Sequence, residues 1–97
     1  MATIGNFTRD GETFAGTITT LALKAKTVIK PVSKSSDQAP DFRVFASGVE
    51  IGAGWSGTSK ANKPYLSLRL DDPSFASPIY GRLIGIETDN QILIWNR

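Results

Sequence analysis

Lysines and arginines with aromatic residues near them are the side chains best suited to chemistry with a partner. Residues 24–34 hold four lysines and no acidic residue, and residues 56–69 add two lysines and one arginine. A basic surface with exposed rings is typical of proteins that hold single-stranded nucleic acid, because charge follows the backbone and rings stack on bases. The predicted nucleic-acid-binding strip comprises Lys24, Lys26, Lys30, Lys60, Lys63 and Arg69, with Trp55 and Tyr65 as stacking residues.

Other interpretations of these cations stay open. Lysines on an edge strand prevent edge-to-edge aggregation, and a charged strand face can serve solubility alone. The net charge of +2 is also small for a nucleic-acid-binding protein. The sequence does not decide whether the two basic segments meet in space.

Two further patterns could carry chemistry but favour structural roles. Asp71 and Asp72 form a carboxylate pair, which can divide acid and base duties, but their position before Pro73 favours turn capping. The stretch 52–57 fits the dinucleotide-binding string GxGxxG. That string needs a long helix behind it, and Pro64 follows too soon, so we expect a flexible loop.

Histidine and cysteine are both absent from the 97 residues. Their absence excludes zinc fingers, disulfides, and every Ser-His or Cys-His catalytic pair. Without histidine, the side chain that normally titrates near neutral pH is missing. The sequence therefore predicts a protein that is not an enzyme, with no catalytic residue, metal site or cofactor. An enzyme acting through Asp71, Asp72 or Glu50 is the weakest alternative.

Short β-strands must position these residues. Apolar residues recur with a period of two, and turn signals interrupt them about every 8–12 residues. We expect an all-β fold of about seven short antiparallel strands, forming a small barrel or a two-sheet sandwich. Residues 1–97 make a single domain, with mobile loops near 33–40 and 52–64. The expected strands are about Thr3–Thr8, Thr13–Leu21, Leu23–Val32, 41–51 with a turn at Gly48, Tyr65–Leu70, Pro78–Ile84 and Gln91–Asn96.

The last expected strand is apolar on both faces, with Ile92 and Ile94 on one and Leu93 and Trp95 on the other. Such a strand is either central or covered by another chain. Leu93 and Trp95 are therefore candidate interface residues for a protein partner or a homodimer. Strand addition to a partner's sheet edge would be the mode of association.

The N-terminal segment has no basic start and no apolar run, and no stretch approaches the length of a membrane span. We expect a cytoplasmic protein with no membrane partner.

Several strings together resemble one bacterial family, the domain of unknown function numbered 736. They are Ile4–Thr8, Phe14–Ile18, Thr20–Lys26, Phe42–Phe45, Glu50–Trp55, Tyr65–Phe75, Pro78–Tyr80 and Leu93–Arg97. The resemblance implies no established activity and no known binding residues. It implies small bacterial proteins often encoded on plasmids or integrative elements near transfer genes. The sequence thus predicts a non-enzymatic binding or accessory protein of a mobile genetic element. The alternative is a protein-interaction or self-associating structural module.

Overall fold

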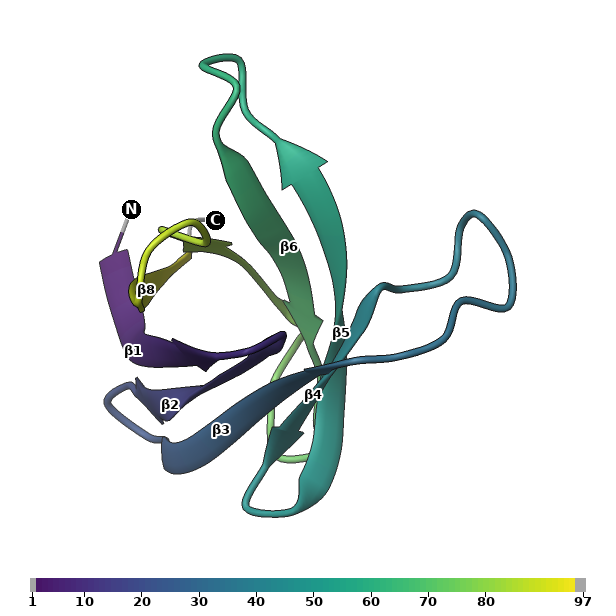
Figure 1. Cartoon of the computed structure of the whole chain (residues 1–97). Helices are drawn as coiled ribbons and strands as arrows, with labels where there is room; N and C mark the ends of the chain where they lie inside the picture. Colours follow the sequence, from purple (N-terminus) through teal and green to yellow (C-terminus); the bar gives the residue numbers. More distant parts are fainter. Residues whose placement is uncertain (1, 96–97) are drawn as a thin grey trace.

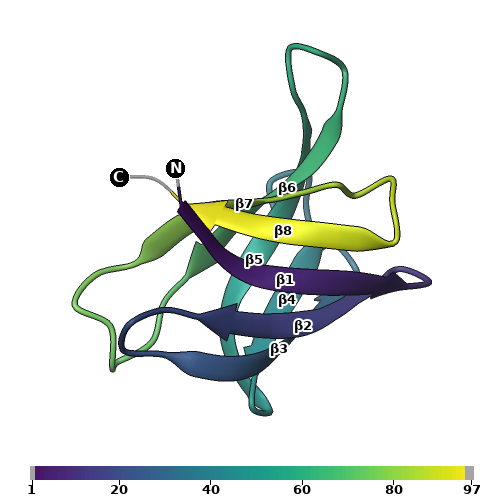
Figure 2. The ribbon, with the colours of Figure 1, turned by 90° about the vertical axis from the view of Figure 1, so that its left-hand side faces the viewer.

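The computed structural model describes residues 2–95, which form a closed antiparallel barrel of eight strands. Each strand pairs with the next along the chain, and β1 pairs with β8 to close the barrel (Figures 1 and 2). The expected all-β fold is confirmed, and of the two predicted architectures the barrel is the one observed, with eight strands where about seven were predicted. Asn96 lies outside the described residues. The strands are β1 (Ala2–Asp10), β2 (Thr13–Thr19), β3 (Lys24–Pro31), β4 (Phe42–Ala46), β5 (Val49–Thr58), β6 (Pro64–Leu70), β7 (Ile79–Ile84) and β8 (Asn90–Trp95).

Alternating side chains fill the inside of the barrel, because successive residues of a strand point to opposite faces. On β6 the leucines at 66, 68 and 70 are buried, whereas Ser67 and Arg69 are exposed. Leu83 and Leu93 continue this core on β7 and β8. The period of two in the sequence therefore separates core residues from surface residues on these strands.

Strand β5 departs from the expectation of a flexible loop over 52–64, since residues 52–58 are strand and only 59–63 form a turn. The glycines in this strand allow close packing against the neighbouring strand. A Cβ on Gly52 would lie 2.2 Å from the carbonyl oxygen of Arg69 on the neighbouring strand. Glycine therefore lets two strands approach. Residues 33–40, expected as a mobile loop, lie in the connection between β3 and β4.

Closure of the barrel pairs every strand of the described chain on both sides. Strand β3 pairs with both β2 and β4, so its lysines are not guarding an edge. Strand β8 pairs with both β7 and β1, so it has no edge to offer a partner's sheet. Both expectations that depended on an edge are wrong, because closure satisfies these backbone groups within the chain.

Successive hairpins place their turns at alternate ends of the barrel. By this alternation the β3–β4 connection and the β5–β6 hairpin lie at the same end, and Figure 1 shows both extending outward from the barrel. The β2–β3 turn lies at the opposite end. Within residues 2–95, no helix could cross a membrane.

Candidate nucleic-acid interface

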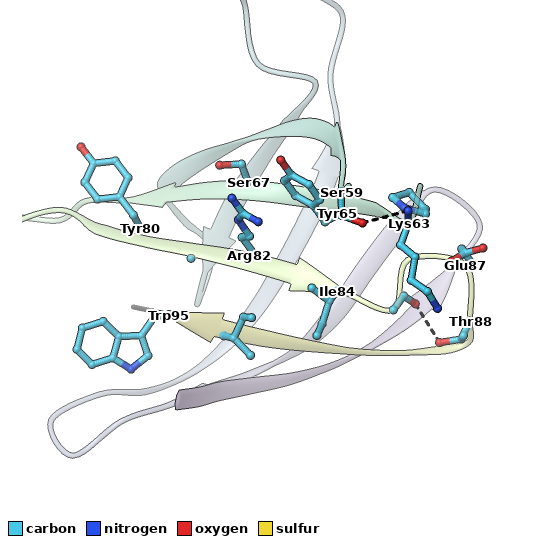
Figure 3. A pocket seen from close by; sticks show the side chains of 14 residues that line it. Ser59, Lys63, Tyr65, Ser67, Tyr80, Arg82, Ile84, Glu87, Thr88 and Trp95 are labelled. Atoms are coloured by element: carbon cyan, nitrogen blue, oxygen red, sulfur yellow. Dashed lines mark hydrogen bonds between the residues drawn. The ribbon is translucent and has the colours of Figure 1, made fainter. Parts of the chain in front are cut away.

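A groove of about 930 Å³ lies on the outer face of β6, β7 and β8. Its walls carry the rings of Tyr65, Tyr80 and Trp95 and the cationic side chains of Lys63 and Arg82. Figure 3 shows Tyr65 beside Arg82 in the middle of the groove, Tyr80 and Trp95 toward one end, and Lys63 toward the other. The groove therefore combines rings and positive charge on one surface.

Strand register explains why these side chains meet. Ser67 on β6 is the backbone partner of Arg82 on β7, and Arg82 is the partner of Ile94 on β8. Leu83 points into the core, so its neighbour Arg82 points outward. Tyr65 lies two residues before Ser67 and shares its outward face, which brings the ring next to Arg82 across the strand pair.

The ring of Tyr65 lies close to residues on both neighbouring strands. A Cβ on Gly57 of β5 would lie 2.7 Å from Cζ of the Tyr65 ring and 2.9 Å from its hydroxyl oxygen. From β7, the guanidinium carbon of Arg82 lies 4.6 Å from the ring centroid. A cation this close to a ring is attracted by its quadrupole. The ring and the planar guanidinium thus form a stacking surface that exists before any ligand binds.

Tyr80 extends this surface along β7 and is exposed over 59% of its area. Its backbone partner on β6 is Arg69. A side-chain hydrogen bond with Tyr80, more than the nearby carboxylate of Asp71, raises the pKa of Arg69 above its usual value. Arg69, which is always cationic in proteins, thus places a positive charge beside the exposed ring of Tyr80.

Lys63 reaches the groove from the short β5–β6 turn. The backbone N–H of Lys63 donates to the hydroxyl of Ser59, and the N–H of Ser59 donates to the carbonyl of Lys63. Asn62 takes a positive φ of 61°, which asparagine tolerates. These bonds fix the turn that carries Lys63. Glu87, between β7 and β8, adds a negative charge to the lining of the groove.

The predicted strip does not exist as one surface. Lys24 and Lys26 lie near the β2–β3 turn, whereas Lys60 and Lys63 lie at the opposite end, in the β5–β6 turn. Strands β4 and β5 also separate β3 from β6. Of the eight predicted residues, Lys63 and Tyr65 line the groove and Arg69 flanks it at Tyr80.

Trp55 faces outward on β5 but is not part of the groove. Its indole N–H donates to the carbonyl oxygen of Gln38, 3.1 Å away, in the connection between β3 and β4. Asp41 at the base of that connection accepts a hydrogen bond from the backbone N–H of Ser56. The connection therefore holds the Trp55 ring, which the sequence suggests as a stacking residue.

The structure also does not place Leu93 and Trp95, the candidate interface residues, together on the outward face of β8. Leu93 is 1% exposed and belongs to the core, because it points into the closed barrel. Trp95 is half-buried against that core and lines the groove. The outward face of β8 is instead Ile92, exposed over 37%, and Ile94.

The carboxylates take structural positions. Asp72 accepts hydrogen bonds from the backbone N–H and the hydroxyl of Ser74, which lower its pKa and confirm the predicted turn cap. Asp71 lies 3.7 Å from Arg69, and Glu50 lies 3.9 Å from Arg43. No group of three residues suited to holding a metal occurs in the part of the chain that the structure describes.

Two groove residues, Tyr80 and Arg82, are missing from the strip that the sequence predicts. A signal for them exists, because the expected strand Pro78–Ile84 alternates Ile79, Gly81 and Leu83 with these two side chains. The missing information is the pairing of this strand with the one that carries Tyr65.

The fold and the groove define a small closed-barrel protein with rings and cations gathered on one outer face. The chain belongs to the family described as Protein of unknown function (DUF736), whose model matches residues 3–97. No curated protein and no solved structure matches it.

Proposed function

We propose that this protein is a non-enzymatic module that binds single-stranded nucleic acid in the groove formed by β6, β7 and β8. Tyr65 and Tyr80 would stack on bases, and Lys63, Arg69 and Arg82 would neutralise phosphates. Stacking on aromatic side chains tolerates any base, and positive charge tracks the backbone. Binding would thus depend weakly on sequence and strongly on salt.

The fixed position of Tyr65 is the observation that carries this proposal. The ring fills the space that Gly57 leaves on β5 and lies beside the guanidinium of Arg82 on β7, so little side-chain freedom would be lost when a base stacks on it. A preorganised surface binds more tightly than a mobile one with the same groups. Arginine also suits this place better than lysine, because its flat guanidinium stacks on rings while carrying charge.

The family resemblance supports a biological setting for this activity. Proteins of this family are expected near transfer genes on plasmids and integrative elements, where single strands arise during DNA transfer. We propose an accessory role in such a mobile genetic element.

Fluorescence anisotropy with a labelled oligothymidine at low salt tests the groove. Loss of the ring in Tyr65→Ala should weaken binding by about 5- to 150-fold, the equivalent of about 1–3 kcal/mol of stacking. Tyr65→Phe is the matched control, since it retains the ring. The proposal fails if the dissociation constant of the wild type is above about 100 μM, or if binding does not depend on salt concentration.

Self-association is the second candidate, because three isoleucines lie together on the outward side of β7 and β8. Ile84 is the partner of Ile92 on this face, and Ile94 follows. Sedimentation velocity on wild type and Ile92→Ser separates the two functions. A wild-type dimer that the substitution converts to monomer supports the structural module; a wild type that stays monomeric at high concentration removes it.

A further inference from the structure

A row of outward residues runs around the barrel from the groove to β3. Tyr80 on β7 is the backbone partner of Arg69 on β6, and Arg69 is the partner of Ala53 on β5. Ala53 is the partner of Arg43 on β4. Arg43 is the partner of Lys30 on β3. The cations of this row, Lys30, Arg43 and Arg69, are called the basic band below.

The register gives the band its length. Four steps of about 4.8 Å between neighbouring strands make about 19 Å from Tyr80 to Lys30 along the surface. Ala53, between the two arginines in this row, carries only a methyl group and is 8% exposed because neighbouring atoms cover it. The band therefore begins where the groove ends and leads away from it.

The acidic partners of the band are weakly engaged. Arg43 lies 3.9 Å from Glu50, and its side chain is 41% exposed. Arg69 lies 3.7 Å from Asp71, and its side chain is 49% exposed. Exposed ion pairs at such distances contribute little to stability, so a phosphate can replace the carboxylate at each arginine.

The far end of the band repeats the arrangement in the groove. The ammonium nitrogen of Lys30 lies 5.7 Å from the ring centroid of Phe45, which faces outward on β4. In the groove, Arg82 lies over Tyr65 in the same relationship. The groove and the far end of the band thus each pair a cation with a ring on the outside of the barrel.

We propose that a single strand bound in the groove continues along the basic band to Lys30 and Phe45. The protein would then be a binder of long single strands, which occupy both surfaces, while short oligonucleotides occupy the groove alone. This inference rests on the proposed function of the groove.

Salt-dependent binding of two labelled oligothymidines, of about 6 and about 20 nucleotides, tests the band. Lys30→Gln/Arg43→Gln removes two cations that would neutralise phosphates. For the long strand, the slope of log K against log salt should fall by roughly 1.4, or about 0.7 for each phosphate that is no longer neutralised. Binding of the short strand should not change. Each variant is compared with wild type at the same strand length, so the larger number of binding registers on a long strand cancels.

Lys24→Gln/Lys26→Gln is the matched control. It removes the same number of positive charges, two, from the outward face of β3 that also carries Lys30, but both lysines lie outside the band. If both double variants weaken the long strand equally, net charge explains the effect and the band is refuted. The band is also refuted if Lys30→Gln/Arg43→Gln changes neither strand, or changes both by the same factor. Failure of wild type to bind either strand would instead overturn the groove itself.

Discussion

The ring of Tyr65 occupies the space in which a side chain at position 57 would lie. A Cβ on Gly57 would come within 2.7 Å of the ring, and every neighbour that it would meet most closely belongs to the Tyr65 side chain. Gly57 therefore sets the position of Tyr65, and through it the stacking surface shared with Arg82.

Gly57→Ala should change the position of the Tyr65 ring while leaving the tyrosine itself in place. The new methyl group would push the Tyr65 ring away from its place, while the fold tolerates the change because only the end of a side chain must move. Alanine also restricts the unfolded chain, which favours the native state by about 0.4–1 kcal/mol. We expect unchanged or slightly higher stability with affinity for single strands lowered at least about fivefold, as loss of stacking predicts. Thermal unfolding and anisotropy measure the two, and unchanged affinity would show that the ring need not be fixed.

Burial inside the barrel should dominate the stability of this small domain. Leu83 is fully buried, whereas Leu21 in the β2–β3 turn is fully exposed. Leu83→Ala should lower the free energy of unfolding by about 2–5 kcal/mol through lost burial and a cavity. The same change at Leu21 should stay within about 0.5 kcal/mol. Urea denaturation compares them, and similar losses at both positions would contradict the closed barrel.

Asp41 links the connection between β3 and β4 to β5. A hydrogen bond from the backbone N–H of Ser56 lowers the pKa of Asp41 below its ordinary value of 3.8. A side-chain hydrogen bond with Lys34 lowers this pKa further, by a smaller amount. A carboxyl group with a lowered native pKa stabilises the fold above its unfolded pKa. That stabilisation disappears as the pH falls through the lower native pKa.

Acid titration of Asp41→Asn should reveal this contribution. Near pH 7 the variant should unfold at a lower temperature than wild type, because it lacks the charge that Lys34 and Ser56 favour. The difference should shrink as the pH falls below 3.8 and through the lower native pKa, where the folded wild-type carboxyl becomes protonated. Thermal midpoints between about pH 7 and pH 2 measure it. A difference that persists unchanged in acid would mean that the amide fails for steric reasons.

The sequence is most informative where one strand is considered by itself. Alternation alone identifies which side chains of β6 point inward, and it places Lys24, Lys26 and Lys30 on one outer face. It cannot show that β3 and β6 are separated, because strand order depends on contacts between distant residues. Gly52 and Gly57 resemble loop signals for a related reason. Their role depends on Arg69 and Tyr65 of the neighbouring strand, which no local pattern reveals.

Arg82 gives the sharpest test of how charge and stacking divide the work in the groove. Arg82→Lys keeps the charge but loses the flat guanidinium that lies 4.6 Å from the Tyr65 ring centroid. We expect weaker binding with the same salt slope, because the number of phosphates neutralised is unchanged. Arg82→Gln should weaken binding and also reduce the slope by about 0.7. Anisotropy over a salt series distinguishes the two variants; if Arg82→Lys binds like wild type, Arg82 acts through its charge alone and contributes no stacking surface.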